Sequence, residues 1–360
     1  MPLTKLWSGH IHRIFVHNLI IELGLSLNKE KNIMEQQLQK KEQLINELKQ
    51  ALEIDCQKEE ARIIEFIQKT IKELHKDGAV IGLSGGLDSS MCAYFLTKAI
   101  GKDKVLAVLL PERDSSIVNH EHAHLVAETL GLKTIDHDMT KTLQEMGVYD
   151  IGIKMLESEE EVAKYAEKDN AKAKLFLGGY AYPDMISALY GGETSTKWKL
   201  VEKLAKKTIY DHFAFQDTKV KLRMVYLYFY AKQHNYAVIG TSDKSEYSIG
   251  LYVKYGDGAN DIQILRHLYK TQLKQLARYM GLPPEIINKP HSGDLYANAP
   301  HTDKLGMSYE KLDMLLLAMD KGYSDEKLVE IVPKKGVDGI KQLKKVAALI
   351  KSLPLSVDSL

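Results

Sequence analysis

The pattern that most constrains this chain is an alternation of short apolar runs with longer helical patterns, which starts after residue 78. The apolar runs have the length of buried strands, and the segments between them have helical spacing. Strand-like and helix-like segments follow one another at residues 79–83, 89–100, 105–110, 117–130, 134–135, 220–232 and 236–239. Strands that alternate with helices form a parallel sheet covered by those helices. The sequence therefore predicts an α/β fold, a parallel sheet flanked by helices.

Composition limits the classes of protein to which the chain can belong. With 360 residues, 44% of them hydrophobic and 27% charged, it has the make-up of a globular protein with an ample core. A formal net charge of +1 gives no overall field that would attract nucleic acid or an anionic membrane. Its two cysteines, Cys56 and Cys92, exclude a disulfide framework and a four-cysteine metal site, and favour a reducing cytoplasm. The apolar stretch 14–25 is too short to span a bilayer. We expect a cytoplasmic protein with no nucleic-acid or membrane partner.

Residues 1–56 form an N-terminal extension that we expect to be partly helical. Met34 opens its helical part and is an alternative start of the working protein. Four apolar side chains then recur at heptad-like spacing: Leu38, Ile45, Leu48 and Leu52. Two interpretations remain open, a docking or dimer face and an ordinary surface helix, because so few turns do not establish a coiled coil.

Residues 57–360 carry the alternating pattern, with a helical insertion at about 140–215 that is rich in Lys and Glu. A long connection with structure of its own is often a lid or a binding loop, and a passive insertion is the alternative. After about Ser308 we expect helices separated at Gly322, Pro333 and Gly339.

The loop Ser84-Gly85-Gly86-Leu87-Asp88-Ser89 joins the first strand to the first helix. Such a turn directs backbone N–H groups at one point, where the helix end adds about half a positive charge. The two glycines let phosphate oxygens approach the backbone closely. Unlike the common lysine-containing phosphate loop, this one carries a carboxylate, Asp88, which would repel phosphate without a cation. The loop therefore predicts a phosphate site that works with a magnesium ion.

Histidines at 120, 122 and 124 raise the question of a second metal site. His120 and His124 are four residues apart, so they share one face of the expected helix. No Glu or Cys on that helix completes a ligand set, and a polar helix face explains the pattern. The sequence alone therefore gives no reason to infer a transition-metal site.

The loop Ser84–Ser89 resembles the signature of the N-type ATP pyrophosphatases, and a second block narrows the resemblance. That block resembles the ammonia-dependent NAD synthetases in order and spacing: residues 240–246, 254–258, Asp261, 268–272, 292–295 and 305–309. The similarity covers about residues 57–140 and 217–320. It implies a Rossmann-like fold of the adenine nucleotide alpha-hydrolase type, and an NAD synthetase-like domain at 57–360.

The resemblance also implies a reaction. The carboxylate of deamido-NAD attacks the α-phosphorus of ATP, pyrophosphate leaves, and ammonia displaces AMP from the acyl-adenylate to give NAD. Such a ligase needs ATP as co-substrate and Mg²⁺, but no covalent enzyme intermediate. Free ammonia or a separate ammonia donor is implied, because the region before the ATP core is too short for a glutaminase domain. The family further suggests a homodimer.

Site residues follow from the positions that match the family's motifs. We expect Asp88, Glu246 and Lys270 to be catalytic, with Asp88 and Glu246 as the magnesium ligands. The ATP-binding set is Gly82, Leu83, Ser84, Gly85, Gly86, Leu87, Asp88, Ser89, Thr241, Lys270 and Ser292. The expected contacts to the second nucleotide are Lys221, Lys254 and Asp261.

Several departures from the family lie on the acceptor side. Lys221 stands where the family has an arginine, and lysine keeps the charge but lacks the planar fork that holds two oxygens at once. Ala259 replaces a glycine, residues 301–304 replace a more acidic loop, and the C-terminal His-Lys pair has no clear match. The ATP half of the motif is intact, whereas the half that recognises deamido-NAD is changed.

Two other classes of function remain open. One is the same adenylation and amidation on a different carboxylate, and the other is a non-catalytic nucleotide-binding protein. Retention of both Asp88 and Glu246 argues against the second class, because a simple binder gains nothing from metal ligands aimed at the α-phosphate. ATP–pyrophosphate exchange separates these classes.

Overall fold

The computed structural model describes residues 31, 32, 34–151, 196–289 and 305–351. The chain divides into two compact units, residues 1–51 and residues 52–360. Residues 34–51 of the first unit are helical. Within the described ranges, no helix combines the length and the hydropathy needed to cross a membrane.

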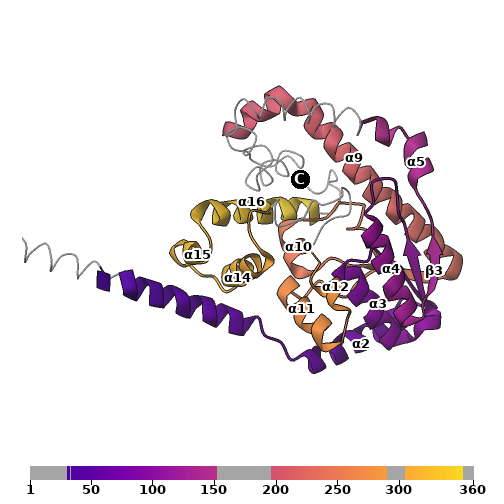
Figure 1. The fold of residues 1–360 in the computed structure, drawn as a ribbon, viewed down its shortest axis with the longest axis horizontal. Coiled ribbons are helices and arrows are strands. Elements are labelled where there is room, and N and C mark those ends of the chain that lie inside the picture. The colour runs from indigo at the N-terminus through magenta and orange to yellow at the C-terminus, as the bar shows by residue number, and fades with distance from the viewer. Residues whose placement is uncertain (1–30, 33, 152–195, 290–304, 352–360) are drawn as a thin grey trace, which may run out of the picture. The chain divides into compact units, whose positions relative to one another are not determined.

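The larger unit is an α/β structure (Figure 1). Its elements in chain order are α2 (Cys56–Glu73), β1 (Gly78–Gly82), α3 (Leu87–Ile100), the 3-10 turn η1 (Lys102–Lys104), β2 (Val105–Leu109), α4 (Ile117–Leu130), β3 (Lys133–Asp136), α5 (Thr140–Glu145), α9 (Thr196–His234), β4 (Tyr236–Gly240), α10 (Lys244–Ile249), β5 (Ile262–Gln263), α11 (Lys270–Tyr279), α12 (Pro284–Ile287), α14 (Tyr309–Asp320), α15 (Asp325–Ile331) and α16 (Lys334–Lys351). The strands and helices expected from the alternating pattern are confirmed.

Five parallel strands form one sheet in the order β3-β2-β1-β4-β5. The predicted α/β fold is therefore confirmed. Strand β1 is central, because Ala79 pairs with Val105 on one side and with Ala237 on the other. Strand β5 was not expected from the sequence, since only two of its residues pair, Ile262 with Ile239 and Gln263 with Gly240.

Alternate side chains of the central strands face two different cores, as the twofold period of a strand requires. Ile81 packs with the helices α2, α3, α4 and α11, and Phe95 of α3 is one of the large side chains buried there. Val80 points the other way and packs with Leu227 of α9. The sheet is thus the middle of three layers. Because both faces are covered, the strands are continuously apolar instead of alternating.

Helix α9 is much longer than the sequence pattern suggested, since it runs from Thr196 to His234 and not only through 220–232. It lies along one face of the sheet in Figure 1. Residues 152–195, most of the expected insertion, lie outside the described residues.

The order of the strands decides where a ligand can enter. From central β1 the chain crosses first to β2 and later to β4 on the opposite side. The segments that follow β1 and β4 therefore separate at the carboxyl edge of the sheet. Open α/β sheets bind ligands at such a switch point. The loop after β1, residues 83–86, and the segment after β4, residues 241–243, both begin at this edge.

The N-terminal part of α4 forms a wall against the loop after β1. Gly85 has a φ of +68°. A β-carbon at this position would lie 2.1 Å from the carbonyl oxygen of Asn119 and 2.7 Å from the backbone nitrogen of Ala123. Both the left-handed backbone and the close approach of α4 therefore require glycine here.

The C-terminal helices differ from expectation at one point. Gly322 and Pro333 do separate helices, but Gly339 lies inside α16, so the break expected there is wrong. The helix continues because its apolar residues recur at helical spacing and are buried: Val337, Ile340, Leu343, Val346 and Ile350. Burial of that face outweighs the cost of about 1 kcal/mol that one glycine imposes on a helix.

The fit between Gly85 and α4 can be tested against a glycine with the same backbone strain and no neighbour. Gly281 has a φ of +73° and nothing within 4 Å of an added β-carbon. Gly281→Ala should lower the free energy of unfolding by about 1–2 kcal/mol, the cost of a left-handed alanine. Gly85→Ala should cost clearly more in urea denaturation, because α4 must also move. Equal losses in the two variants would contradict the close approach.

Candidate active site

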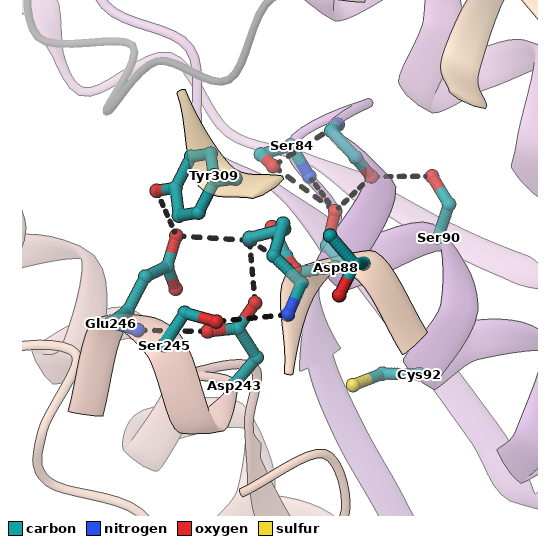
Figure 2. Close-up of polar contacts among 12 residues, drawn as sticks. Ser84, Asp88, Ser90, Cys92, Asp243, Ser245, Glu246 and Tyr309 are labelled. Atoms are coloured by element: carbon teal, nitrogen blue, oxygen red, sulfur yellow. Dashed lines mark hydrogen bonds and ion pairs between the residues drawn. The ribbon is translucent and has the colours of Figure 1, made fainter. Parts of the chain in front are cut away.

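The loop after β1 is held in shape by its own serines (Figure 2). Ser89 Oγ accepts a hydrogen bond from the backbone N–H of Ser84 at 3.2 Å and donates to the carbonyl of Gly86 at 3.2 Å. Ser84 Oγ lies 3.0 Å from Ser89 Oγ and accepts from the N–H of Gly86 at 3.4 Å. Gly86 is also the N-cap of α3 and has no side chain to cap that helix. The N-terminal N–H groups of α3 therefore remain directed at the space beside the loop.

A buried ammonium group lies next to this loop and is surrounded by three carboxylates. Lys270 Nζ is 2.6 Å from Asp88 Oδ1, 3.0 Å from Asp243 Oδ2 and 3.0 Å from Glu246 Oε1. The side chains of Lys270 and Asp243 are fully buried, and that of Glu246 is 12% exposed. The predicted catalytic residues Asp88, Glu246 and Lys270 thus meet at one point, although they come from α3, α10 and α11.

Burial and mutual charge shift the pKa values in this cluster. Burial raises the pKa of Asp243 well above its ordinary value, with Lys270 opposing the rise. Burial likewise raises the pKa of Glu246 to about 7; Lys270 opposes this rise, and Asp88 adds to it. Burial alone would lower the pKa of Lys270, but the charges of Asp243, Asp88 and Glu246 raise it well above the ordinary value. When all three carboxylates are ionised, the single ammonium does not neutralise them, and a further cation would balance the remaining negative charge.

Asp243 is the residue of the cluster to which the sequence analysis assigned no role. It follows β4 and is the N-cap of α10, where its Oδ1 accepts from the N–H of Glu246 at 2.9 Å. An Asp at the start of a helix is explained by capping alone. Nothing in the local sequence shows that its other oxygen contacts Lys270, 27 positions further along.

Helix α14 supports the cluster from the outside. Its Asp313 accepts from Ser245 Oγ at 2.5 Å and from the N–H of Thr271 at 2.8 Å, and Ser245 Oγ accepts from the N–H of Lys270 at 2.9 Å. Burial raises the pKa of Asp313 to about 6. Tyr309 of the same helix donates to Glu246 Oε1 at 3.3 Å (Figure 2). Asp313 follows Leu312 and precedes the apolar run 314–318, and an acidic residue at such a place is the one sequence signal that would have pointed to this tie.

Three carboxylates of this cluster are placed so that they could hold a metal ion. One oxygen each from Asp88, Asp243 and Glu246 lies within 4.8 Å of the other two. Oxygen donors of this kind suit a hard divalent cation. The sequence analysis named Asp88 and Glu246 for this purpose, and the geometry adds Asp243.

Most of the remaining predicted ATP contacts lie at the end of β1 or β4 or beside the loop, and one is not described. Thr241 is the first residue after β4, at the carboxyl edge of the sheet. Gly82 ends β1, and Leu83 and Leu87 flank the loop as buried side chains. Ser292 lies outside the described residues.

For the three predicted acceptor contacts, the structure gives other neighbours. Lys221 on α9 pairs with Asp217 one turn away, at 3.5 Å, and is half exposed. Lys254 Nζ lies 5.3 Å from the centre of the Tyr255 ring. Asp261 accepts from the N–H of Val238 at 2.8 Å, so it supports the edge of β4.

A second buried lysine, which the sequence analysis did not single out, lies beyond the carboxyl end of β2. Lys219 Nζ is 3.1 Å from Glu112 Oε1 and 2.7 Å from Asp114 Oδ2, and it lies 3.9 Å from the centre of the Phe215 ring. Tyr149 donates to the other oxygen of Glu112 at 2.8 Å. This group ties α9 to the loop after β2. Lys219 is only two residues from Lys221, but its side chain is fully buried.

Neither cysteine is prepared for nucleophilic attack. Cys92 is buried in α3 with its thiol directed at the carbonyl of Gly240, and burial, followed by the charge of Asp88, raises its pKa well above the ordinary value. Burial also raises the pKa of Cys56. A thiolate is the reactive form of cysteine, so these environments disfavour a covalent thioester route.

The chain is similar to known proteins along most of its length. The sequence profile described as NAD synthase matches residues 59–189 and 193–354. An NH(3)-dependent NAD(+) synthetase of Methanocaldococcus jannaschii is 34% identical over 74% of this chain and 83% of the relative. That of Thermotoga maritima is 33% identical over 82% of this chain and 98% of the relative.

Solved structures show the same fold. The NMN synthetase from Francisella tularensis aligns with a TM-score of 0.60 at 22% identity, over 84% of this chain and 99% of that one. The NH3-dependent NAD synthetase from Campylobacter jejuni aligns with a TM-score of 0.55 at 23% identity, over 85% and 100%. With the profile covering most of the chain and relatives above 30% identity along most of their length, this protein belongs to the NAD synthase family.

Proposed function

We propose that the protein makes NAD from deamido-NAD, ATP and ammonia, and releases AMP and pyrophosphate. The single observation that carries this proposal is the junction of the phosphate loop with Lys270 and its three carboxylates. The printed names of the relatives, NH(3)-dependent NAD(+) synthetases, point to the same reaction. The enzyme is then a ligase that forms a C–N bond.

The chemistry follows from the residues at that junction. The N–H groups of the loop and of the start of α3 bind the phosphates of ATP, and Lys270 stabilises the negative charge that grows on the leaving pyrophosphate. The substrate carboxylate forms a bond to the α-phosphorus as the bond to pyrophosphate breaks. Ammonia then forms the C–N bond and loses a proton as AMP leaves. Positioning and charge stabilisation suffice for this sequence, and no protein nucleophile is needed.

A magnesium ion fits the carboxylate cluster. Asp88, Asp243 and Glu246 would hold it, since they offer clustered oxygen donors whose charge exceeds that of Lys270. When bound, the ion neutralises charge on the phosphates of ATP. A cation here also lowers the pKa of Glu246 and keeps its carboxylate ionised near neutral pH.

Purified protein with ATP, Mg²⁺ and an ammonium salt should convert deamido-NAD to NAD with equimolar AMP and pyrophosphate. Asp88→Asn and Glu246→Gln keep shape but remove charge at the phosphates, so each should lower kcat/KM by about 100-fold or more. Glu326→Gln, at an exposed position on α15, is the matched control and should be unaffected. Full activity in Glu246→Gln would rule out the assigned role.

The same assay decides between acceptors. If no NAD forms, but ATP–pyrophosphate exchange appears with another carboxylic acid, the enzyme performs this chemistry on that acid instead. Nicotinic acid mononucleotide is the first alternative acid to try. Its amide is NMN, the product after which the aligned NMN synthetase from Francisella tularensis is named. If no acceptor supports ATP cleavage, the enzyme proposal fails and a nucleotide-binding protein is the better account.

Lys221 offers a test of the acceptor side alone. Its side chain is half exposed on α9 and pairs only loosely with Asp217, so replacement should not disturb the fold. Lys221→Arg should keep kcat and lower the KM for deamido-NAD by up to about tenfold, because a guanidinium can hold two oxygens at once. The KM for ATP should not change. A higher KM for deamido-NAD in Lys221→Arg would contradict this role.

We also propose that the protein acts as a homodimer in the cytoplasm and takes its ammonia from solution or from a separate donor. The homodimer rests on family resemblance. Light scattering should give twice the mass of the chain, and the mass of one protomer would reject the dimer. Cell fractionation tests the location.

A further inference from the structure

A cluster of two histidines and one aspartate lies on the larger unit outside the candidate active site. His120 and His124 are one turn apart on α4, and Asp136 is the last residue of the edge strand β3. His120 Nε2 lies 2.7 Å and His124 Nε2 lies 3.0 Å from the same oxygen, Asp136 Oδ2. The three ligand atoms are within 4.8 Å of one another. All three side chains are between 36% and 40% exposed, so an ion can reach them from solvent.

We propose that His120, His124 and Asp136 form a binding site for a divalent transition-metal ion of the zinc type, with water completing its coordination. Two imidazole nitrogens and one carboxylate oxygen are a donor set that such ions prefer. Two histidines spaced by four residues on one helix face are a common way to present two of these donors. The third donor comes from β3, which is why inspection of the helix sequence alone does not find it.

The geometry needs little adjustment for an ion to enter. Around a tetrahedral ion with bonds of about 2.0–2.1 Å, neighbouring ligand atoms are about 3.3 Å apart. The nitrogen–oxygen distances of 2.7 and 3.0 Å must therefore open by about 0.6 and 0.3 Å, and the two nitrogens, which lie within 4.8 Å of each other, must adopt about the same 3.3 Å spacing. Each ring must carry its proton on Nδ1 so that Nε2 can bind the ion. The rings are in edge contact, with centroids 4.6 Å apart, and both nitrogens already point at one oxygen.

Two neighbouring histidines, His137 and His122, are not among the proposed metal ligands. His137 follows Asp136 directly, but successive strand residues point to opposite faces, and its Nδ1 lies 3.1 Å from the hydroxyl of Tyr230 on α9. His122 faces the loop after β1, where its Cβ would lie 2.9 Å from a β-carbon at position 85. The site therefore uses a different face of α4 from the one that meets the phosphate loop.

A metal ion here would join α4 to β3. Two of its bonds go to the helix and one goes to the strand, so the ion fixes the position of α4 on the edge of the sheet. The same helix forms the wall against Gly85. The role that follows from the geometry is structural, because an ion bound to the folded chain stabilises it by mass action.

Zinc binding to the full chain tests the proposal. Zinc is titrated by calorimetry in excess Mg²⁺, which occupies the hard carboxylate cluster around Lys270 but competes poorly for imidazole. The unaltered protein should bind one more zinc ion than each of His120→Ala, His124→Ala and Asp136→Asn, or bind it at least tenfold more tightly. Added zinc should also raise the thermal unfolding midpoint of the unaltered protein and not of these variants. All three positions are partly exposed, so the variants should fold, and circular dichroism checks that they do.

A matched control comes from another exposed histidine that pairs with a carboxylate. His267 Nε2 lies 2.6 Å from Glu59 Oε1, and its side chain is 36% exposed, but among the described residues it has no second histidine beside it. His267→Ala should bind zinc as the unaltered protein does. If the three site variants also bind zinc with unchanged number and affinity, the proposal is overturned. If only Asp136→Asn keeps the unaltered affinity, the three-ligand set is wrong.

Discussion

The structure of the candidate site depends on one buried charge, the ammonium group of Lys270. A buried ammonium is costly unless opposite charges and hydrogen bonds surround it. Asp88 on α3, Asp243 at the N-cap of α10 and Glu246 on α10 supply those charges at 2.6, 3.0 and 3.0 Å. Because the carboxylates come from α3 and from the start of α10, and Lys270 comes from α11, none of these helices can move independently without weakening the pairing of the buried ammonium. Burial of the ammonium alone would cost folding free energy. Paired with its carboxylates, it fixes the position of the phosphate loop relative to the carboxyl end of β4.

Close backbone packing fixes the other side of the phosphate loop. Gly85 allows the carbonyl of Asn119 on α4 to lie where any side chain would otherwise be. The loop is therefore held between α4 on one side and the Lys270 cluster on the other. A loop held on both sides is preorganised, which is the condition under which backbone N–H groups stabilise charge most effectively.

The sequence predicts the parts of this arrangement that are local. Strands β1 to β4 and the loop at 84–89 follow from period and turn chemistry, and both are found where expected. Asp243 was not assigned because a helix cap explains it fully at short range, whereas its contact with Lys270 is a tertiary one. Gly339 was read as a helix break because local propensity was the only guide, and burial of its neighbours on α16 overrides that propensity. Asp136 was not paired with the histidines for a similar reason, since a strand and a helix meet only in the folded chain.

The two buried lysines hold different parts of the structure. Lys270 is held by carboxylates that also face the phosphate loop, so a change at any of them alters both the fold and the chemistry. Lys219 is held by Glu112 and Asp114, and its role is to join α9 to the loop after β2. The fully buried side chain of Lys219 secures this junction. Lys221, two positions later, is half exposed and is not needed for it. A change of residue at 221 is therefore expected to leave the fold intact.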